Sequence, residues 1–271
     1  MGELPELNDA FDLPQDCVRE FQEAGHTRVR ALASPEEVAA YRPALLRAAP
    51  KGRYDDRPLE ERDTYGKAFI QMFNLWTHDE QARAFIFARR FAGVAARLMG
   101  VEGVRLYHDQ ALFKEPGGGA TPWHQDQFYW PLDTDRTITL WMPLVRVTPE
   151  MGPMEFASGS HRLGSLGDYK IGDESEAVFA QIVDERSLPV RGYGDFEPGD
   201  ASFHAGWTLH RAPGNASQRM REVMTVIYFA DGTRVAPLDN PNRRFDRDVW
   251  MPGCQPGEPA ASDLNPVLFP G

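Results

Sequence analysis

The chain has 271 residues, of which 42% are hydrophobic, enough for a sizeable core, and β-barrels of this length often form one domain. Lysine and arginine total 29 against 40 acidic residues, a formal net charge of −11, which argues against binding nucleic acid or an anionic membrane. Cys17 and Cys254 lie far apart without CxxC or histidine-rich spacing, so neither a disulfide framework nor a thiolate zinc site is expected. No signal-peptide pattern or long apolar stretch occurs. We therefore expect a cytoplasmic protein with a small-molecule partner, and both a monomer and a homodimer stay open.

The first part of the chain carries helical patterns. A helix is expected from Leu13 to Ala24, with Asp12 as its cap. A second helix opens at Ser34-Pro35-Glu36-Glu37, which combines a capping residue, a proline at the first position and acidic residues in the first turn. A third helix is expected from about Asp79 to Leu98. The polar stretch from Lys51 to Tyr65 is predicted to be a mobile loop at the mouth of a pocket.

From Val104 onward the pattern changes to short strands separated by Gly and Pro clusters. Strands are expected at Val104–Lys114, Thr137–Leu144 and Arg221–Phe229. The segment Leu163–Gly194 has few strand signals and many charges, and we interpret it as an insertion that covers the pocket. Helices first and strands afterwards favour an α+β layout in a single domain, 1–271. It comprises a helical part (about 12–100), a strand core (about 104–232) and a Pro- and Gly-rich wrapping tail (about 233–271).

The triplet His124-Gln125-Asp126 is the strongest pointer to chemistry. Residues two apart in a strand point to the same face, so His124 and Asp126 can converge on one point, where a metal is the obvious occupant. Such triplets are common by chance, but His210 supplies a second imidazole further along the chain. Two imidazoles and one carboxylate leave about half of an octahedral shell open, which suits Fe(II) that also binds a co-substrate and dioxygen.

A guanidinium follows the second imidazole. A turn built from Pro213, Gly214 and Asn215 leads to Arg221, at the start of an apolar run. The planar fork of an arginine can bind a carboxylate through two hydrogen bonds, which lysine cannot do.

Together these motifs resemble a known family. The string His124-Gln125-Asp126-Gln127-Phe128-Tyr129-Trp130-Pro131, Trp141, the Gly159-Ser160-His161-Arg162 turn and the block from His210 through Asn215-Ala216-Ser217 to Arg221 are similar to the phytanoyl-CoA dioxygenase (PhyH-like) family of Fe(II)/2-oxoglutarate oxygenases. The match extends from about Asp12 to Pro266. The resemblance implies a double-stranded β-helix, a jelly-roll or cupin-like core, with the N-terminal helices packed on one sheet.

The resemblance also implies roles for individual residues. His124, Asp126 and His210 would hold Fe(II), Arg221 would bind the distal carboxylate of 2-oxoglutarate, and O2 would take the last position on the metal. Lys67, Gln110 and Trp141 would line the 2-oxoglutarate pocket.

Several assignments have alternatives. His204 is a rival to His210 because it has the same strand parity, and otherwise it is expected to be a packed or supporting histidine. Arg219 is the alternative to Arg221, and His108 is either a buried, hydrogen-bonded imidazole or a substrate contact. The aromatic residues near the ligands are either core residues or walls of a substrate pocket, namely Phe128, Tyr129, Trp130 and Trp207.

The expected activity is hydroxylation of an unactivated C–H bond, with decarboxylation of 2-oxoglutarate to succinate. A net charge of −11 disfavours a polyanionic acyl-CoA, and the aromatic residues favour a compact, largely apolar intermediate of natural product biosynthesis.

Epimerisation, cyclisation or desaturation with the same cofactors, and hydroxylation of an acyl-CoA, remain alternatives, whereas Asp126 argues against halogenation. A non-catalytic ligand-binding member of the fold is the second alternative. A zinc hydrolase is disfavoured because no HExxH motif is present.

Overall fold

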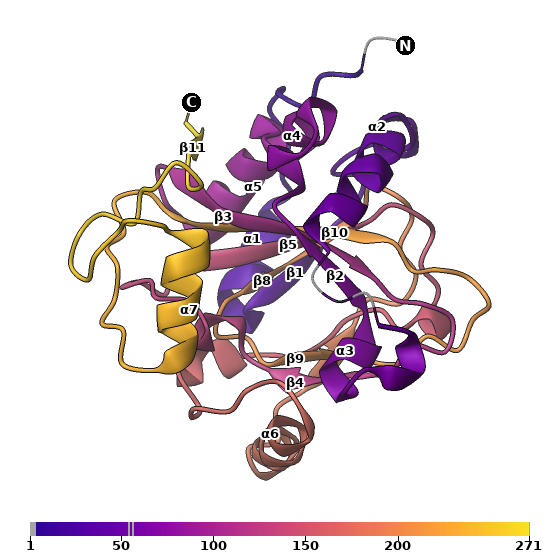
Figure 1. Cartoon of the computed structure of the whole chain (residues 1–271), viewed down its shortest axis with the longest axis vertical. Helices are drawn as coiled ribbons and strands as arrows, with labels where there is room; N and C mark the ends of the chain where they lie inside the picture. Colours follow the sequence, from indigo (N-terminus) through magenta and orange to yellow (C-terminus); the bar gives the residue numbers. More distant parts are fainter. Residues whose placement is uncertain (1–3, 54, 56, 271) are drawn as a thin grey trace.

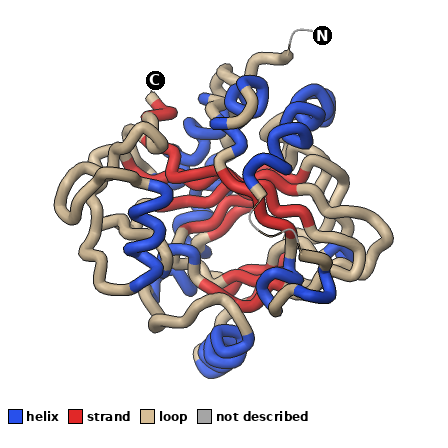
Figure 2. Tube along the Cα trace, viewed as in Figure 1, coloured by secondary structure: helices blue, strands red, loops and turns tan. Residues whose placement is uncertain are grey.

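The computed structural model describes residues 4–53, 55 and 57–270 of the chain. Two antiparallel sheets face each other, and most helices cover the outer face of the larger sheet (Figures 1 and 2). The helices are α1 (Gln15–Ala24), α2 (Pro35–Ala48), α3 (Thr64–Ala68), α4 (Glu80–Ile86), α5 (Arg89–Met99), α6 (Asp173–Glu185) and α7 (Pro241–Trp250). The strands are β1 (His26–Val29), β2 (Ile70–Phe73), β3 (Val104–Phe113), β4 (Thr121–His124), β5 (Thr137–Pro143), β6 (Glu155–Ala157), β7 (Val190–Gly192), β8 (Ala201–Ala205), β9 (His210–Ala212), β10 (Val223–Ala230) and β11 (Val267–Phe269). The expectation of an α+β double-stranded β-helix is confirmed.

The larger sheet has the strand order β1-β8-β5-β10-β3-β11, and β2 also pairs with β3. Its central strands β5 and β10 are buried almost throughout, and a continuous apolar sequence is typical of strands covered on both faces. The register aligns two rows of side chains across these strands. One row contains Gln110, Thr225 and Trp141, and the other contains His108, Ile227, Thr139 and His204.

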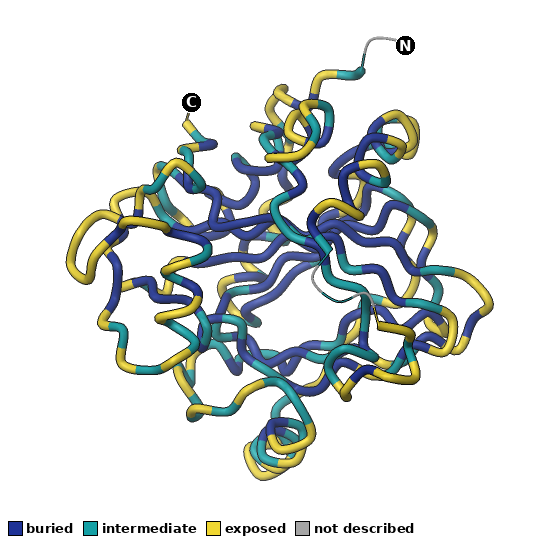
Figure 3. The backbone as a smooth tube through the Cα atoms, viewed as in Figure 1, coloured by how far each residue is buried: buried dark blue, intermediate teal, exposed yellow. Residues whose placement is uncertain are grey.

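The smaller sheet has the order β4-β9-β6-β7. In it His124 pairs with His210, and His210 pairs in turn with Phe156 on β6. Helix α6 packs on the outer face of this sheet, where the backbone N–H of Trp123 donates to the Glu176 carboxylate over 2.7 Å. Burial is concentrated in the strands of both sheets, while much of α6 is exposed (Figure 3).

The helices follow the expected pattern with two corrections. The second helix has the predicted capping box, in which Ser34 and Glu37 each satisfy a backbone N–H of the other. The first helix starts at Gln15 without a side-chain cap, so the prediction of Asp12 as its cap was wrong. The third predicted helix is two helices, α4 and α5, because Ala88 adopts a non-helical conformation with ψ 114°.

Regions predicted to be irregular or purely helical also contribute regular elements. The N-terminal part supplies β1 and β2, and the tail supplies β11, all to the larger sheet. The segment 163–194 contains α6 and β7, and the tail contains α7. In the predicted loop Lys51–Tyr65, Tyr54 and Asp56 lie outside the described residues. None of the helices in the described part of the chain combines the length and the hydropathy that crossing a bilayer requires.

Candidate metal and co-substrate site

A cavity of about 460 Å³ lies between the two sheets. Alternate residues of the central strands form its floor, as the period of a β-strand requires. They are His108, Gln110 and Leu112 of β3, Thr139 and Trp141 of β5, and Thr225 and Ile227 of β10. Strands β4 and β9 close the opposite side, and α7 contributes Asn242, Phe245, Asp246 and Trp250.

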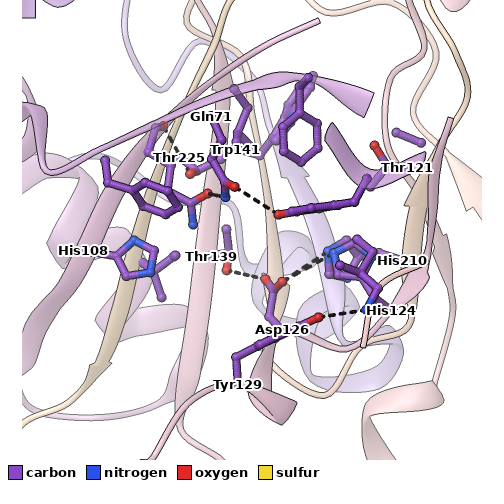
Figure 4. A pocket seen from close by; sticks show the side chains of 18 of the residues that line it. Gln71, His108, Thr121, His124, Asp126, Tyr129, Thr139, Trp141, His210 and Thr225 are labelled. Carbon is purple, nitrogen blue, oxygen red and sulfur yellow. Dashed lines mark hydrogen bonds and ion pairs between the residues drawn. The ribbon is translucent and has the colours of Figure 1, made fainter. Parts of the chain in front are cut away.

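Three potential metal ligands meet in this cavity. One ligand atom from each of His124, Asp126 and His210 lies within 4.8 Å of the others. The Asp126 Oδ1 atom is 3.6 Å from His124 Nε2 and 3.7 Å from His210 Nε2 (Figure 4). His124 is the last residue of β4, and extended Gln125 leads into a short helical turn, so that Asp126 faces the same side as His124.

Backbone contacts orient both imidazoles. The Nδ1 atom of His124 is 2.8 Å from the Pro122 carbonyl oxygen, and that of His210 is 2.9 Å from the Thr208 carbonyl oxygen. Because a carbonyl only accepts, each Nδ1 carries the proton and each Nε2 presents its lone pair to the cavity. Burial lowers the pKa of His124 to about 3 and that of His210 to about 4. Both rings are therefore neutral at pH 7, the form that binds a metal.

The second carboxylate oxygen of Asp126 is held by the larger sheet. Thr139 Oγ1 donates to Asp126 Oδ2 over 3.1 Å, and His204 Nε2 lies 3.2 Å from the same oxygen. Burial raises the pKa of Asp126, but the neighbouring His210 and the hydrogen bond from His204 outweigh it and hold the pKa well below its usual value. Asp126 is thus an anion whose Oδ1 is directed between the two imidazoles.

The structure separates the two rival histidines. His204 lies on β8 in the larger sheet, whereas His210 lies on β9 in the smaller one, so the expectation of a shared strand parity was wrong. The two rings are nevertheless close, with centroids 4.3 Å apart. His204 contacts the outer oxygen of Asp126, and its Nδ1 atom has no hydrogen-bond partner in the described part of the chain.

Arg221 lies at the end of the cavity near Trp141, with its guanidinium carbon 5.6 Å from the centre of that ring. Its side chain is fully buried, its Nη1 donates to the Gly152 carbonyl oxygen, and its Nε has no partner among the described residues. No carboxylate in the described ranges lies within ion-pair distance of it. Burial lowers the pKa of Arg221 to about 9, which leaves it charged at pH 7. A buried, charged guanidinium with a donor left over is a group that an anionic ligand would stabilise.

The turn that precedes Arg221 explains its position. Asn215 Nδ2 donates to the carbonyl oxygens of Lys114 and Arg219, at 3.0 and 2.7 Å, while Asn215 Oδ1 accepts from the Ser217 backbone and hydroxyl groups. This Asx turn brings Arg221 beside Lys114, just before β10 begins. Arg219 is exposed and does not line the cavity.

The remaining predicted site residues divide into two groups. Those that line the cavity are Gln110, Trp141, Tyr129 and Trp130. Those that are not among the described lining residues are Lys67, Phe128 and Trp207. The backbone carbonyl of Lys67 accepts from Gly119, Phe128 packs on Tyr129 at 4.9 Å between ring centroids, and the carbonyl of Trp207 accepts from Gln125.

Sequence reasoning missed several cavity residues. Gln71 on β2 donates to Gln110 Oε1 over 2.6 Å, and Tyr65 lies 3.2 Å from Gln71 Oε1. Asp246 and Trp250 come from α7, in the segment predicted to be a surface tail. Strand alternation could have identified Thr139, which is two residues before Trp141, but no local pattern brings α7 to the cavity.

The chain was compared with known proteins. The family model for phytanoyl-CoA dioxygenase (PhyH) matches residues 21–223. A probable alpha-ketoglutarate-dependent hypophosphite dioxygenase of Stutzerimonas stutzeri is 25% identical over 224 residues, which cover 78% of this chain and 77% of that protein. A methylphosphonate hydroxylase of Gimesia maris (strain ATCC 29201 / DSM 8797 / 534-30) is 30% identical over 136 residues, or 50% of this chain and 49% of that protein.

Among solved structures, the non-heme alpha ketoglutarate dependent carbocyclase SnoK from nogalamycin biosynthesis superposes with a TM-score of 0.77 and 26% identity. The superposition covers 94% of this chain and 96% of that one. The family match spans α2 to α6, β1 to β9 and all three converging side chains. The chain therefore belongs to the phytanoyl-CoA dioxygenase family.

Proposed function

We propose that the protein is a non-haem Fe(II)- and 2-oxoglutarate-dependent oxygenase that hydroxylates an unactivated C–H bond of a compact, largely apolar small molecule. The observation that carries the proposal is the convergence of His124, Asp126 and His210 in one cavity with the buried Arg221, whose Nε has no partner among the described residues. The named activities of the hypophosphite dioxygenase and the carbocyclase support the same cofactor class.

The donor set fits Fe(II). Two neutral imidazole nitrogens and one carboxylate oxygen form the facial set that leaves other coordination positions open. The backbone contacts of His124 and His210 and the contacts of Asp126 with Thr139 and His204 orient the donors in advance, as supporting groups do at metal sites. Bound there with 2-oxoglutarate, Fe(II) would activate O2 for oxidation of a C–H bond, with release of succinate and CO2.

Arg221 fits the distal carboxylate of 2-oxoglutarate. Its Nε lacks a partner in the part of the chain that the structure describes. The cavity wall also contains Trp141, Thr225 and Leu112, which together offer an apolar surface and one hydroxyl. The Thr225 hydroxyl donates to the Gln110 carbonyl oxygen over 3.3 Å, so it can still accept. This end of the cavity therefore binds one anion and excludes water around it.

The rest of the cavity positions the substrate. Figure 4 places His108 across the cavity from His124 and His210, with Asp126 between them and Tyr129 beside Asp126. The Ile171 backbone N–H donates to the Tyr129 hydroxyl over 2.8 Å, which ties the segment before α6 to the site. A volume of about 460 Å³ is in the usual range for a small-molecule site.

An acyl-CoA is a poorer candidate substrate. Its phosphates need cations, and besides Arg221 the described lining contains only Lys170 and Arg211. Arg211 is already paired with Glu155 at 2.8 Å and lies 3.7 Å from Glu176. Lys170 alone is exposed and free to meet a phosphate.

The test is succinate formation by purified protein with Fe(II), 2-oxoglutarate and O2, followed by product analysis with panels of polycyclic or terpenoid molecules and of acyl-CoAs. We expect all three cofactors to be required, substrate-stimulated turnover with a compact apolar molecule, and a product heavier by one oxygen. A product of unchanged mass would indicate epimerisation, and a loss of two hydrogens would indicate desaturation or cyclisation. Selective hydroxylation of an acyl-CoA would refute the substrate class, and no succinate under any condition would refute the activity.

We also place the enzyme in the reducing cytoplasm, as a proposal supported by the free thiols of Cys17 and Cys254.

A further inference from the structure

Asp246 is a buried carboxylate that faces the cavity without a cation. It lies on α7, is 7% exposed and belongs to the cavity lining. Tyr107 donates its hydroxyl hydrogen to Asp246 Oδ2 over 2.7 Å, and no described residue donates to Oδ1. None of the described lysines and arginines forms an ion pair with it, although α7 also carries Arg243, Arg244 and Arg247. One carboxyl oxygen is therefore left for a ligand. Burial raises the pKa of Asp246 to about 7, so a cation placed beside it would favour the ionised form.

Aromatic rings surround this part of the cavity. Phe73 packs against Trp250 in a tilted arrangement with ring centroids 4.8 Å apart, and the His108 ring centroid lies 4.7 Å from that of Trp250. Tyr129 and the half-exposed Phe245 also line the cavity. The faces of such rings attract a cation, and their surfaces accommodate apolar carbon.

His108, Gln71 and Tyr65, which also line the cavity, carry no positive charge. Burial lowers the pKa of His108 to about 3, so this imidazole is neutral at pH 7, and its Nδ1 has no partner in the described ranges. Gln71 and Tyr65 are uncharged, and Asp63 at the cavity wall is acidic. Lys170 is exposed. A phosphonate or hypophosphite, as named for the curated relatives, would meet Asp246 here without a buried cation to balance it.

We propose that Asp246 binds a protonated amine or quaternary ammonium group, so that the substrate of this site is a compact apolar molecule that carries a basic nitrogen. This inference rests on the proposed function, because it assigns the substrate class of that same cavity. The pairing would satisfy the unmatched carboxylate, and the rings of Phe73 and Trp250 would contact the carbon next to the nitrogen. The neutral His108 would supply one further hydrogen bond to a hydroxyl or carbonyl group of the substrate.

The first experiment compares ligands of similar size that differ in charge. Isothermal titration calorimetry of the protein with Fe(II) and 2-oxoglutarate, under nitrogen, measures binding of 1,2,3,4-tetrahydroisoquinoline, isochroman, benzylphosphonate and hypophosphite. Isochroman replaces the basic nitrogen with an ether oxygen at the same ring position. We expect the amine to bind about 10- to 150-fold more tightly than isochroman, as one charged hydrogen bond predicts. The two anions are expected to bind most weakly.

The second experiment tests the residue. Asp246→Asn keeps the shape and an acceptor for Tyr107 but removes the charge, so the amine should bind about as weakly as isochroman. Asp63→Asn is the matched control, because it removes a charge from the same cavity and can still cap α3 through Gly66. Its affinity for the amine should stay within about twofold of the unmodified protein, and isochroman binding should not respond to either change.

Three results would overturn the proposal: equal affinity for the amine and isochroman, tighter binding of either anion, or an unchanged amine affinity in Asp246→Asn. The first two need only the unmodified protein, so they decide the matter even when the variant does not fold. A wrong proposed function gives a different result. In that case the protein forms no succinate, but it still binds the amine more tightly than isochroman.

Discussion

The backbones of Lys114 and Arg221 exchange two hydrogen bonds of 2.9 Å, which places two buried basic side chains next to each other. Lys114 Nζ donates to the carbonyl oxygens of Gly119 and Pro213, at 2.7 and 2.9 Å, and so fastens the loops before β4 and after β9. Arg221 is left with a free Nε and no carboxylate among the described residues. Lys114 thus has a structural role, because carbonyl groups satisfy its ammonium group. Arg221 is available to bind an anion.

Arg221→Ala should raise the concentration of 2-oxoglutarate required for turnover. Loss of a hydrogen bond between charged groups costs about 1.5–3 kcal/mol, which corresponds to about 10- to 150-fold in affinity. Metal-supported binding of 2-oxoglutarate measures this directly. Arg219→Ala is the matched control and should leave the affinity unchanged, because Arg219 is exposed. The reverse pattern would assign the carboxylate to Arg219.

Removal of a metal ligand should abolish both Fe(II) retention and succinate formation. Asp126→Ala and His210→Ala each leave two ligands, which hold the metal loosely and open the wrong positions. Metal content after gel filtration and succinate release give two independent readouts. Near-normal activity in His210→Ala together with its complete loss in His204→Ala would show that His204 is the true ligand.

His204 is expected to act as a positioning residue. Its Nε2 lies 3.2 Å from Asp126 Oδ2, so it restrains the carboxylate, while Asp126 Oδ1 lies near the imidazoles of His124 and His210. Loss of such a supporting contact typically lowers metal affinity about 10- to 100-fold. His204→Ala should show this loss in a titration with Fe(II), and His204→Gln should recover much of it because an amide N–H can still donate. Equal behaviour of the two variants would mean that His204 only fills space.

The stability of the protein should depend on Asp109. Burial raises the pKa of Asp109 to about 7, while its Oδ2 accepts from the Leu75 backbone N–H over 2.9 Å. Between about pH 4 and pH 7 the unfolded chain has lost this proton and the folded protein keeps it, so the free energy of unfolding falls as pH rises.

Asp109→Asn removes this dependence and keeps an acceptor for Leu75. From pH 5 to pH 8 the variant should gain about 1–3 kcal/mol in unfolding free energy relative to the unmodified protein, measured by urea denaturation. Asp135→Asn, whose side chain is 77% exposed, should show no such gain and serves as the control. A constant difference between the proteins at both pH values would contradict the prediction.

The fold class and most elements of the core follow from local patterns. The strands at 104–113, 137–143 and 223–230 were predicted within a few residues because their apolar runs and flanking turns act over short distances. The capping box of Ser34 and Glu37 is equally local. The break between α4 and α5 was not predictable, because the apolar periodicity continues across Ala88 and only packing decides its non-helical conformation.

The candidate site shows the same division between local pattern and tertiary contact. His124, Asp126, His210 and Arg221 were proposed from their spacing and from the family resemblance. The end of β4 and the turn after it position His124 and Asp126, and the Asx turn at Asn215 positions Arg221. That His204 reaches Asp126 depends on the pairing of β8 with β5, and that Asp246 reaches the cavity depends on how α7 packs. The sequence by itself thus determined the chemistry of the candidate metal donors, because side-chain type specifies it and short-range spacing brings His124 and Asp126 together. Only the tertiary structure decided which side chains share the cavity, because strand pairing and burial join residues that are far apart in the chain and set the environment of each charge.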